Sequence, residues 1–211
     1  MTPTEKLDEG LAELGLDLDA SIRQRLLDYL SLLGRWNRTY NLTSVRAELA
    51  MVGAHLLDSL SVLPYLGRPD SLADVGSGAG LPGIPLAMAR PDMVVSLIES
   101  IQKKASFLTQ AKIDLALGNV SIYCARAEEL GGSEAFRPAQ VVISRAFADL
   151  ASFVRVASGL LAPGGRLLAM KGMHPGAEID SLPQGWEVLQ CHPLKVPGLA
   201  AQRHLIIIER V

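Results

Sequence analysis

The sequence contains 211 residues with a formal net charge of −2 at neutral pH. Apolar residues make up 49% of the chain and charged residues 20%, a composition that is typical of globular proteins and excludes an intrinsically disordered one. This length is sufficient for one α/β domain with a complete core and a short additional segment. Because the overall charge is slightly acidic, any contact with a nucleic acid requires a local basic patch.

Cysteine usage and hydropathy exclude several further classes of protein. The two cysteines, Cys124 and Cys191, form neither a CxxC motif nor a zinc spacing, so we expect no bound metal and no disulfide framework. The N-terminal stretch MTPTEKLDEG is acidic and polar, unlike a signal peptide. No apolar run approaches the roughly 18 residues that a membrane-spanning helix needs. We therefore expect a cytoplasmic protein that does not bind membranes and that is a monomer, since no exposed apolar seam is evident.

The first 65 residues show the spacing of amphipathic helices. Apolar residues recur at intervals of three and four, first at Leu7, Leu11 and Leu14 and then at Ile22, Leu26, Leu30 and Leu33. A third helical stretch is predicted at about 46–60. We interpret residues 1–65 as an N-terminal helical extension that packs on the core of a domain covering residues 66–211, the two parts forming one structural unit.

From residue 71 onward, short apolar runs alternate with helical stretches. The predicted strands are SLADVG (71–76), VVSLIES (94–100), VSIYCAR (120–126), AQVVISR (139–145) and GRLLAMKG (165–172). Helices are predicted at 83–90, 101–116 and 147–159, which indicates a parallel sheet covered by helices on both faces. The last two strands, in GWEVLQCHPLKV and HLIIIERV, are separated by a loop too short for a parallel crossover, so they should form an antiparallel hairpin.

The stretch DVGSGAGLPG (74–83) lies between the first predicted strand and a helix, where open α/β sheets bind their ligands. Its glycines, including Gly76, Gly78 and Gly80, leave room for a ligand against the backbone. The GAGLPG half satisfies the GxGxxG dinucleotide fingerprint, which keeps an NAD(P)-dependent oxidoreductase open. Asp74, expected at the mouth of the loop, would repel a pyrophosphate but suits a cationic amine such as that of S-adenosylmethionine.

Polar side chains follow the other predicted parallel strands. Glu99 ends the second strand, where a carboxylate can accept hydrogen bonds from ribose hydroxyls of either cofactor. Ala127 and Glu128 follow the third strand and either flank an adenine or begin a helix whose dipole favours the acidic charge. Arg145 and Lys171 occupy the ends of the fourth and fifth strands. Because guanidinium groups form bidentate contacts with carboxylates and phosphates, we expect Arg145 to bind an anion in the cleft.

Basic and aromatic residues cluster near the end of the second predicted helix. Arg35, Arg38 and Arg46 lie close in sequence to Trp36 and Tyr40, a combination that suits phosphate contact and base stacking. The alternative is that the two aromatic residues pack the helical extension on the core, and we favour this for the aromatics while expecting at least one arginine to contact phosphate.

The stretch HLLDSL contains a histidine, an aspartate and a serine but does not indicate a hydrolase. His55, Asp58 and Ser59 fall within one helix, and the chain has no GxSxG nucleophile motif. The spacing of three residues between His55 and Asp58 instead predicts a local hydrogen bond between them.

Six segments together resemble a known family. They are RWNRTYNLTSVR (35–46), HLLDSL (55–60), DVGSGAGLPGIPLA (74–87), VISRAFA (142–148), MKG (170–172) and RHLIIIE (203–209). In these motifs the chain is similar to the bacterial 16S ribosomal RNA guanine-N7 methyltransferases, the glucose-inhibited division protein B family. The resemblance implies a Rossmann-like class I methyltransferase fold: a seven-stranded, mostly parallel sheet with a C-terminal antiparallel hairpin, and an N-terminal helical extension.

The same resemblance implies an activity and its partners. The expected cofactor is S-adenosyl-L-methionine, and the expected reaction is methylation of N7 of guanine-527 in the 530 loop of 16S rRNA, within RNA or the small ribosomal subunit. The NAD(P)-dependent oxidoreductase and a non-catalytic ribosome-assembly factor are the alternatives. Guanine N7 carries a lone pair and no proton, so no general base is required and no catalytic residue is assigned.

Site residues are carried over by matching position. With the loop residues argued above, the expected cofactor-binding set is Asp74, Gly76, Gly78, Gly80, Leu81, Glu99, Ser100, Ile101, Ala127, Glu128 and Arg145. Candidates for positioning the reactants are Arg145, Lys171 and Asn41. Candidates for contacting the RNA substrate are Arg35, Arg38, Arg46, His55 and Arg203.

Overall fold

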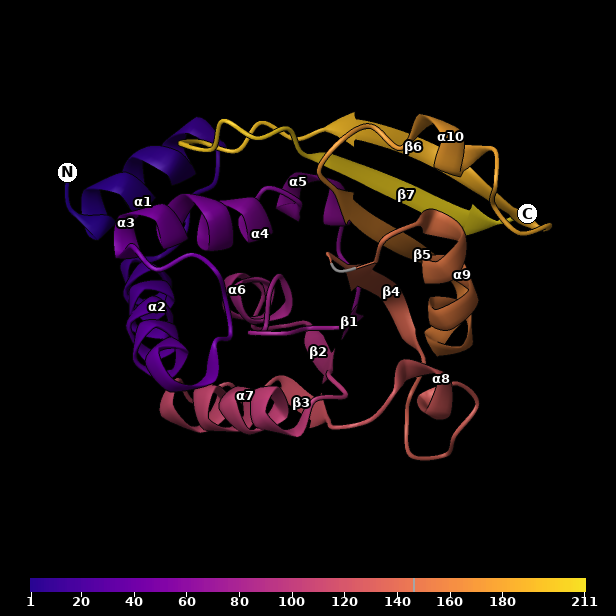
Figure 1. Ribbon diagram of the computed structural model, residues 1–211, viewed down its shortest axis with the longest axis horizontal. Coiled ribbons are helices and arrows are strands. Elements are labelled where there is room, and N and C mark those ends of the chain that lie inside the picture. The colour runs from indigo at the N-terminus through magenta and orange to yellow at the C-terminus, as the bar shows by residue number, and fades with distance from the viewer. Residues whose placement is uncertain (146) are drawn as a thin grey trace.

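The computed structural model describes residues 1–145 and 147–211 (Figure 1). The chain begins with α1 (Pro3–Glu13) and α2 (Ala20–Tyr40). At the start of α1, the Thr2 hydroxyl accepts a hydrogen bond from the Glu5 amide while the Glu5 carboxylate accepts one from the Thr2 amide, which satisfies two otherwise unpaired donors. Helix α2 ends where Asn41 adopts a left-handed conformation with φ of 49°.

The next helical stretch is irregular. It consists of α3 (Glu48–Met51), the π-helical segment η1 (Val52–Leu57), α4 (Asp58–Leu60) and α5 (Leu63–Leu66). By length and composition this 19-residue stretch, Glu48–Leu66, could span a membrane, with mean hydropathy of 1.4. The expectation that no apolar run is long enough to span a membrane was therefore wrong, because the few polar residues in this stretch do not lower its mean hydropathy sufficiently. The stretch is 67% buried within the protein, as expected for a helix of a folded core.

Seven strands form one sheet in the order β3-β2-β1-β4-β5-β7-β6. They are β1 (Ser71–Val75), β2 (Val94–Ile98), β3 (Val120–Tyr123), β4 (Ala139–Ser144), β5 (Leu161–Lys171), β6 (Trp186–Pro193) and β7 (His204–Arg210). Strands β1 to β5 pair in parallel, and β7 runs antiparallel to both β5 and β6. The predicted parallel sheet and C-terminal antiparallel hairpin are thus confirmed. The strand order reverses between β1 and β4, which places the switch point at the end of β1.

Further helices connect the parallel strands. They are α6 (Gly83–Ala89), α7 (Gln102–Asp114), α8 (Ala127–Leu130), α9 (Leu150–Ala157) with a 3-10 turn η2 (Ser158–Leu160), and α10 (Gly176–Ile179). Helix α9 begins later than the predicted 147 because the Asp149 side chain accepts a hydrogen bond from the Ser152 amide and so caps it at Leu150. The four-residue helices α8 and α10 are too short to leave a periodic signal.

The sheet separates two hydrophobic cores. Successive strand residues point to opposite faces, so that Leu72 enters one core and Ala73 the other. The first core also contains apolar residues of α1, α2, α6 and α7, whereas the second is covered by α8 and α9. The predicted leucine stripe of α2 is buried in the first core. The N-terminal helices therefore share a core with the sheet, and Figure 1 shows them beside α6 and α7.

One side chain joins the N-terminal helices directly to the glycine loop. Tyr29 of α2 is fully buried, and its hydroxyl donates a hydrogen bond of 2.6 Å to the Ala79 carbonyl oxygen. Burial raises the pKa of Tyr29, so its hydroxyl keeps its proton and remains a donor. The loop conformation thus depends in part on a helix that precedes it by 50 residues.

We expect Tyr29→Phe to lower the free energy of unfolding by about 1–2 kcal/mol, because the Ala79 carbonyl would lose its buried donor. Urea denaturation measures this difference. Tyr40→Phe is the matched control, since Tyr40 is 39% exposed and its loss of a hydroxyl should change stability by less than about 0.5 kcal/mol. Equal stability of the two variants would contradict the proposed role of the Tyr29 hydroxyl.

Candidate functional site

The glycine loop folds back over the end of β1 at the switch point. Gly76, Gly78 and Gly80 have positive φ values of 70°, 58° and 88°, a backbone conformation that residues other than glycine rarely adopt. The amides of Gly76 and Ser77 both donate to the Ile98 carbonyl at the end of β2. A Cβ atom at Gly78 would meet only the Gly76 carbonyl oxygen, at an ordinary contact distance of 3.9 Å, so the backbone there can be approached closely by a ligand.

Asp74 lies beneath this loop rather than at its mouth. Its side chain is fully buried, and Oδ2 accepts a hydrogen bond of 2.9 Å from the Gly83 amide at the start of α6. The predicted position at the mouth of the loop was therefore wrong, because the residue belongs to β1 and its side chain is buried against the start of α6. Among the described residues, Oδ1 has no hydrogen-bond partner. Burial raises the pKa of Asp74 to about 7.

Glu99 connects the ends of two strands. Its carboxylate accepts hydrogen bonds from the Gly78 amide at 2.9 Å and from the Ile101 amide at 2.8 Å, one on each oxygen. The side chain therefore holds the loop after β1 against the loop after β2. A carboxylate has about four acceptor positions, two on each oxygen. Because each oxygen of Glu99 uses one of them for a backbone amide, each keeps one acceptor position free for a hydroxyl group.

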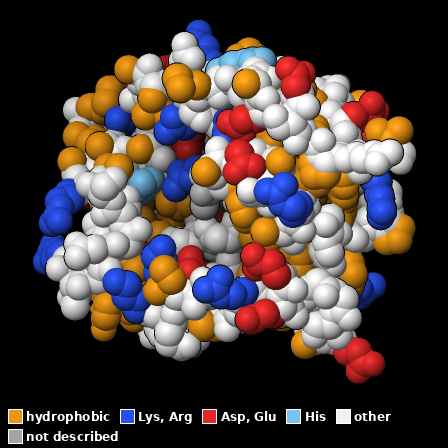
Figure 2. Space-filling model, turned by 45° about the vertical axis from the view of Figure 1, so that its right-hand side comes forward, with side chains coloured by type: hydrophobic (Ala, Val, Ile, Leu, Met, Phe, Trp, Pro, Cys, Tyr) orange, Lys and Arg blue, Asp and Glu red, His pale blue; other side chains and the backbone are white. Residues whose placement is uncertain are grey.

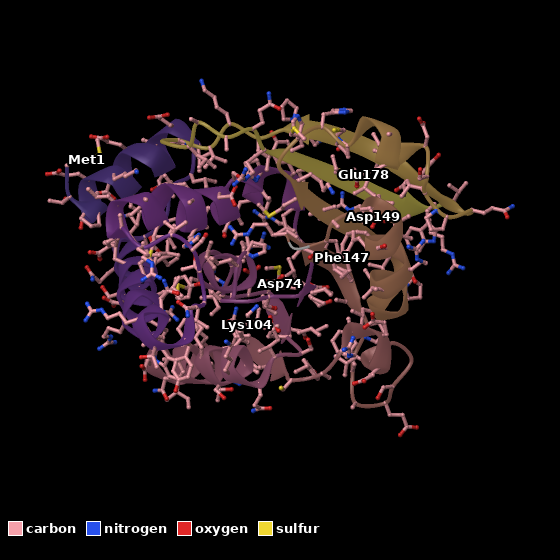
Figure 3. The ribbon with its side chains drawn as sticks, viewed as in Figure 1. Met1, Asp74, Lys104, Phe147, Asp149 and Glu178 are labelled. Carbon is pink, nitrogen blue, oxygen red and sulfur yellow. The ribbon has the colours of Figure 1, made fainter. Side chains whose placement is uncertain are left out.

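A cavity of about 220 Å³ opens at the carboxyl ends of the strands. Four residues of the predicted cofactor set line it, namely Gly76, Ser100, Ala127 and Glu128. Arg126, Phe147 and Val156 also line it and were missed by sequence reasoning, although Phe147 stands in the ISRAFA motif directly after β4. Figure 3 shows Phe147 and Asp74 in the central part of the molecule, between the N-terminal helices and β5.

Other members of the predicted set do not line this cavity. A Cβ atom on Gly80 would meet the Ile84 and Leu108 side chains within about 3 Å, so this glycine is required by core packing. Leu81 is only 4% exposed and belongs to the same core. Ile101 is 43% exposed at the start of α7.

Arg145 points toward the N-terminal helices. Its Nη1 atom donates to the Asp58 carboxylate at 2.9 Å and to the Ala54 carbonyl at 3.2 Å. Arg203, a predicted RNA contact, donates from Nε to the other oxygen of Asp58 at 2.9 Å. The two predicted basic residues therefore meet at one buried carboxylate. Figure 2 shows that basic and acidic side chains lie close together around a recess in the molecular surface.

The predicted hydrogen bond between His55 and Asp58 was wrong. The segment Val52–Leu57 is π-helical, with a wider turn than the α-helical spacing that brings residues i and i+3 together. His55 Nε2 instead lies 2.9 Å from the Thr43 hydroxyl, and the side chain is 4% exposed. Burial also lowers the pKa of His55, so the ring is neutral as well as buried, which does not favour the predicted contact with RNA.

The remaining positioning candidates have structural partners. Lys171 donates to the Ala148 carbonyl at 2.6 Å and forms an ion pair of 3.0 Å with Glu178. Glu178 also accepts a hydrogen bond from the Leu150 amide, so Lys171 ties β5 to the loop that carries Phe147. Asn41 is the exposed C-cap of α2.

The three predicted basic residues line one open groove of about 960 Å³ beside α2. Arg35, Arg38 and Arg46 are exposed there, but Asp28, Glu48 and Asp114 line the same groove, so acidic charges balance the basic ones. Within α2, Trp36 is partly buried against the core and its ring centroid lies 5.6 Å from that of Phe107. Packing is thus the observed role of Trp36.

Comparison with known proteins identifies the family. The family described as rRNA small subunit methyltransferase G matches residues 22–206. The Ribosomal RNA small subunit methyltransferase G of Aromatoleum aromaticum is 53% identical over 208 residues, which cover 97% of each chain. TrmN from Thermus thermophilus has a TM-score of 0.58 at 18% identity, with 84% of this chain and 52% of TrmN covered.

M. jannaschii TYW2, whose structure was solved in complex with AdoMet, has a TM-score of 0.52 at 17% identity. The match covers 67% of this chain and 69% of TYW2. At these identities the structural matches establish the fold, which is the class I methyltransferase fold with its mostly parallel, seven-stranded sheet. The family match over residues 22–206 and the near full-length match at 53% identity show that the chain belongs to the small-subunit ribosomal RNA methyltransferase G family.

Proposed function

We propose that this protein transfers a methyl group from S-adenosyl-L-methionine to N7 of guanine-527 in the 530 loop of 16S rRNA. The observation that carries the proposal is 53% identity across 97% of the chain to a ribosomal RNA small subunit methyltransferase G. The glycine loop at the switch point of the sheet supports a bound nucleoside cofactor. The resemblance in the RWNRTYNLTSVR and VISRAFA segments supports the particular atom and position.

The residues at the end of the parallel strands fit this cofactor. Glu99 has acceptor positions left for ribose hydroxyls, and the open backbone at Gly78 lets a ligand come close. Gly76, Ala127 and Glu128 line the adjoining cavity, which would hold part of the nucleoside. When ionised, Asp74 with its unpaired Oδ1 supplies a negative potential beneath the loop, which favours a cationic ligand through charge rather than direct contact.

The bound donor supplies an electrophilic methyl group on a sulfonium. Guanine N7 attacks with its lone pair, so the new carbon–nitrogen bond forms as the carbon–sulfur bond breaks and no proton has to be removed first. The protein's task is therefore to align the reactants at about 3 Å, which accounts for a large rate enhancement by itself. Positive charge moves from sulfur to the purine, so a cation beside N7 would be unfavourable.

The proposed substrate fits the distribution of basic residues only in part. N7 lies on the edge of guanine that faces the deep major groove of an RNA helix, so proteins reach it in loops or opened regions. Arg35, Arg38 and Arg46 are exposed along one groove and are available to contact phosphates.

A small-subunit RNA substrate implies a cytoplasmic enzyme, and we propose that it acts as a monomer.

Two alternatives are separated by structure and assay. The GxGxxG match that suggested a dinucleotide loses weight because Gly80 is required by packing against Ile84, and because the chain belongs to a methyltransferase family. A non-catalytic assembly factor would bind the cofactor and the ribosomal subunit without transferring a methyl group.

We expect the purified protein to transfer labelled methyl groups from S-adenosylmethionine to small ribosomal subunits that lack the modification. Mass spectrometry of nuclease digests should identify 7-methylguanosine, and mapping should locate it at guanine-527. Subunits already modified at this position are the control and should accept no label. Binding of cofactor and subunit without transfer would instead identify an assembly factor.

Asp74→Asn should remove a pH dependence from both stability and cofactor affinity. In the folded protein the pKa of Asp74 is raised from 3.8 to about 7, so the native state binds a proton more tightly than the unfolded chain. The stabilisation that this bound proton gives to the folded state is therefore fully present below about pH 4, and it is lost as the pH rises through about 7. The asparagine can still accept from Gly83, so the stability of the variant relative to wild type should increase over this range.

Cofactor affinity should show the opposite dependence. A cationic ligand favours the ionised Asp74, so wild-type affinity should rise with pH up to about 7, whereas the Asp74→Asn variant should bind more weakly without this rise. Urea titrations and calorimetry between pH 5 and 8 measure the two effects. Parallel pH profiles for both proteins would rule out a charged role for Asp74.

A further inference from the structure

Asp58 is a fully buried carboxylate that joins three separate parts of the chain. It lies in α4 of the N-terminal helices, and its two oxygens bind Arg145, directly after β4, and Arg203, directly before β7. Both ion pairs are 2.9 Å long, with partners 87 and 145 residues away in sequence. A buried charge is tolerated only when it is paired and hydrogen-bonded, so this carboxylate strongly restricts where both guanidinium groups lie.

Toward residues 1–145 and 147–211, both guanidinium groups keep unused donors. Within this part of the chain Arg145 donates only from Nη1, to Asp58 and the Ala54 carbonyl, and Arg203 donates from Nε to Asp58 and from Nη1 to the Gln202 carbonyl. Their side chains are 28% and 24% exposed. One carboxylate against two guanidiniums leaves a single positive charge, and the remaining N–H groups form the planar donor arrangement that binds carboxylates and phosphates.

Arg145 directly follows Ser144, whose hydroxyl donates a hydrogen bond of 2.7 Å to the Val75 carbonyl oxygen at the end of β1, where the glycine loop begins. The positive charge of Arg145 also lowers the pKa of Asp74 and of Tyr29, against the larger effect of burial. Phe147, two residues further along the chain, lines the cofactor cavity. The ion-paired cluster therefore lies between the N-terminal helices and the proposed methyl-transfer site.

We propose that Asp58 is a positioning residue, which holds Arg145 and Arg203 so that their free N–H groups bind an anionic group of a reactant. This inference rests on the proposed function and adds to it a residue of the helical extension that acts through another side chain. Two sources supply the required anion, the carboxylate of the methyl donor and a phosphate of the RNA. Asp58 itself touches neither reactant.

Three variants separate positioning from a purely structural role. Arg203→Gln keeps the balanced pair of Asp58 and Arg145. Adding Asp58→Asn leaves Arg145 without its counter-ion, and because this side chain is partly exposed, water can solvate the charge and the protein should fold. Adding Arg145→Gln as well removes the last charge of the cluster. Asp8→Asn is the matched control, since it removes a carboxylate from an exposed ion pair with Arg23.

Two measurements distinguish the sources of the anion. Calorimetry gives the affinity for S-adenosylhomocysteine, which carries the same carboxylate as the donor, and steady-state kinetics give the KM for small ribosomal subunits. We expect one of these to worsen roughly tenfold when Asp58→Asn is added to Arg203→Gln, with no further loss when Arg145→Gln follows. A loss in the first measurement identifies the carboxylate, and a loss in the second identifies a phosphate.

The outcomes are separable from a failure of the proposed function. If wild-type protein neither binds S-adenosylhomocysteine nor methylates subunits, the proposed function is wrong. If wild type is active and Asp58→Asn in the Arg203→Gln background changes only the melting temperature, Asp58 is structural and the positioning role is overturned. The same conclusion follows if affinity and KM worsen only when Arg145→Gln is added, or if Asp8→Asn causes an equal loss.

Discussion

The glycine loop depends on one buried hydrogen bond, from the Gly83 amide to the Asp74 carboxylate. It holds the start of α6 so close to β1 and β2 that a Cβ atom on Gly83 would clash with Leu97 Cδ2 and would lie 2.8 Å from Asp74 Oδ2. With α6 in this position, the intervening backbone must turn sharply, which Gly76 and Gly78 permit through their positive φ values. The cost is a carboxyl group removed from water with one oxygen left unpaired, and a ligand cation nearby would offset part of it.

The N-terminal helices complete this site from the other side. Tyr29 holds the loop through the Ala79 carbonyl, and Asp58 holds the arginines that follow β4 and precede β7. Leucines of α1 and α2 share a hydrophobic core with β1 and β2. The N-terminal extension therefore contributes to the geometry at the carboxyl ends of the strands. A substitution in these helices should alter the geometry of the site as well as the stability of the fold.

Local patterns predicted the fold well and the directions of side chains poorly. The spacing of Leu26 and Leu30 predicted a buried helical face, and the glycines predicted a loop, because both depend on residues close in sequence. The burial of Asp74 depends on how α6 packs on β1, and the partner of Arg145 lies 87 residues away, so neither leaves a local signal. His55 was misplaced for a different reason: the prediction assumed an α-helix where the backbone is π-helical.

The position of β7 bears on how this protein is made. It is the last strand in chain order, yet it lies between β5 and β6, and its successive isoleucines alternate between the two cores. Ile207 enters the core shared with the N-terminal helices, and Ile206 and Ile208 enter the other. Neither core can close while these residues are still inside the exit tunnel of a translating ribosome. Final folding must therefore wait until β7 has left the tunnel, and the glycine loop, though made well before β7, acquires its mature surroundings only once that strand is in place.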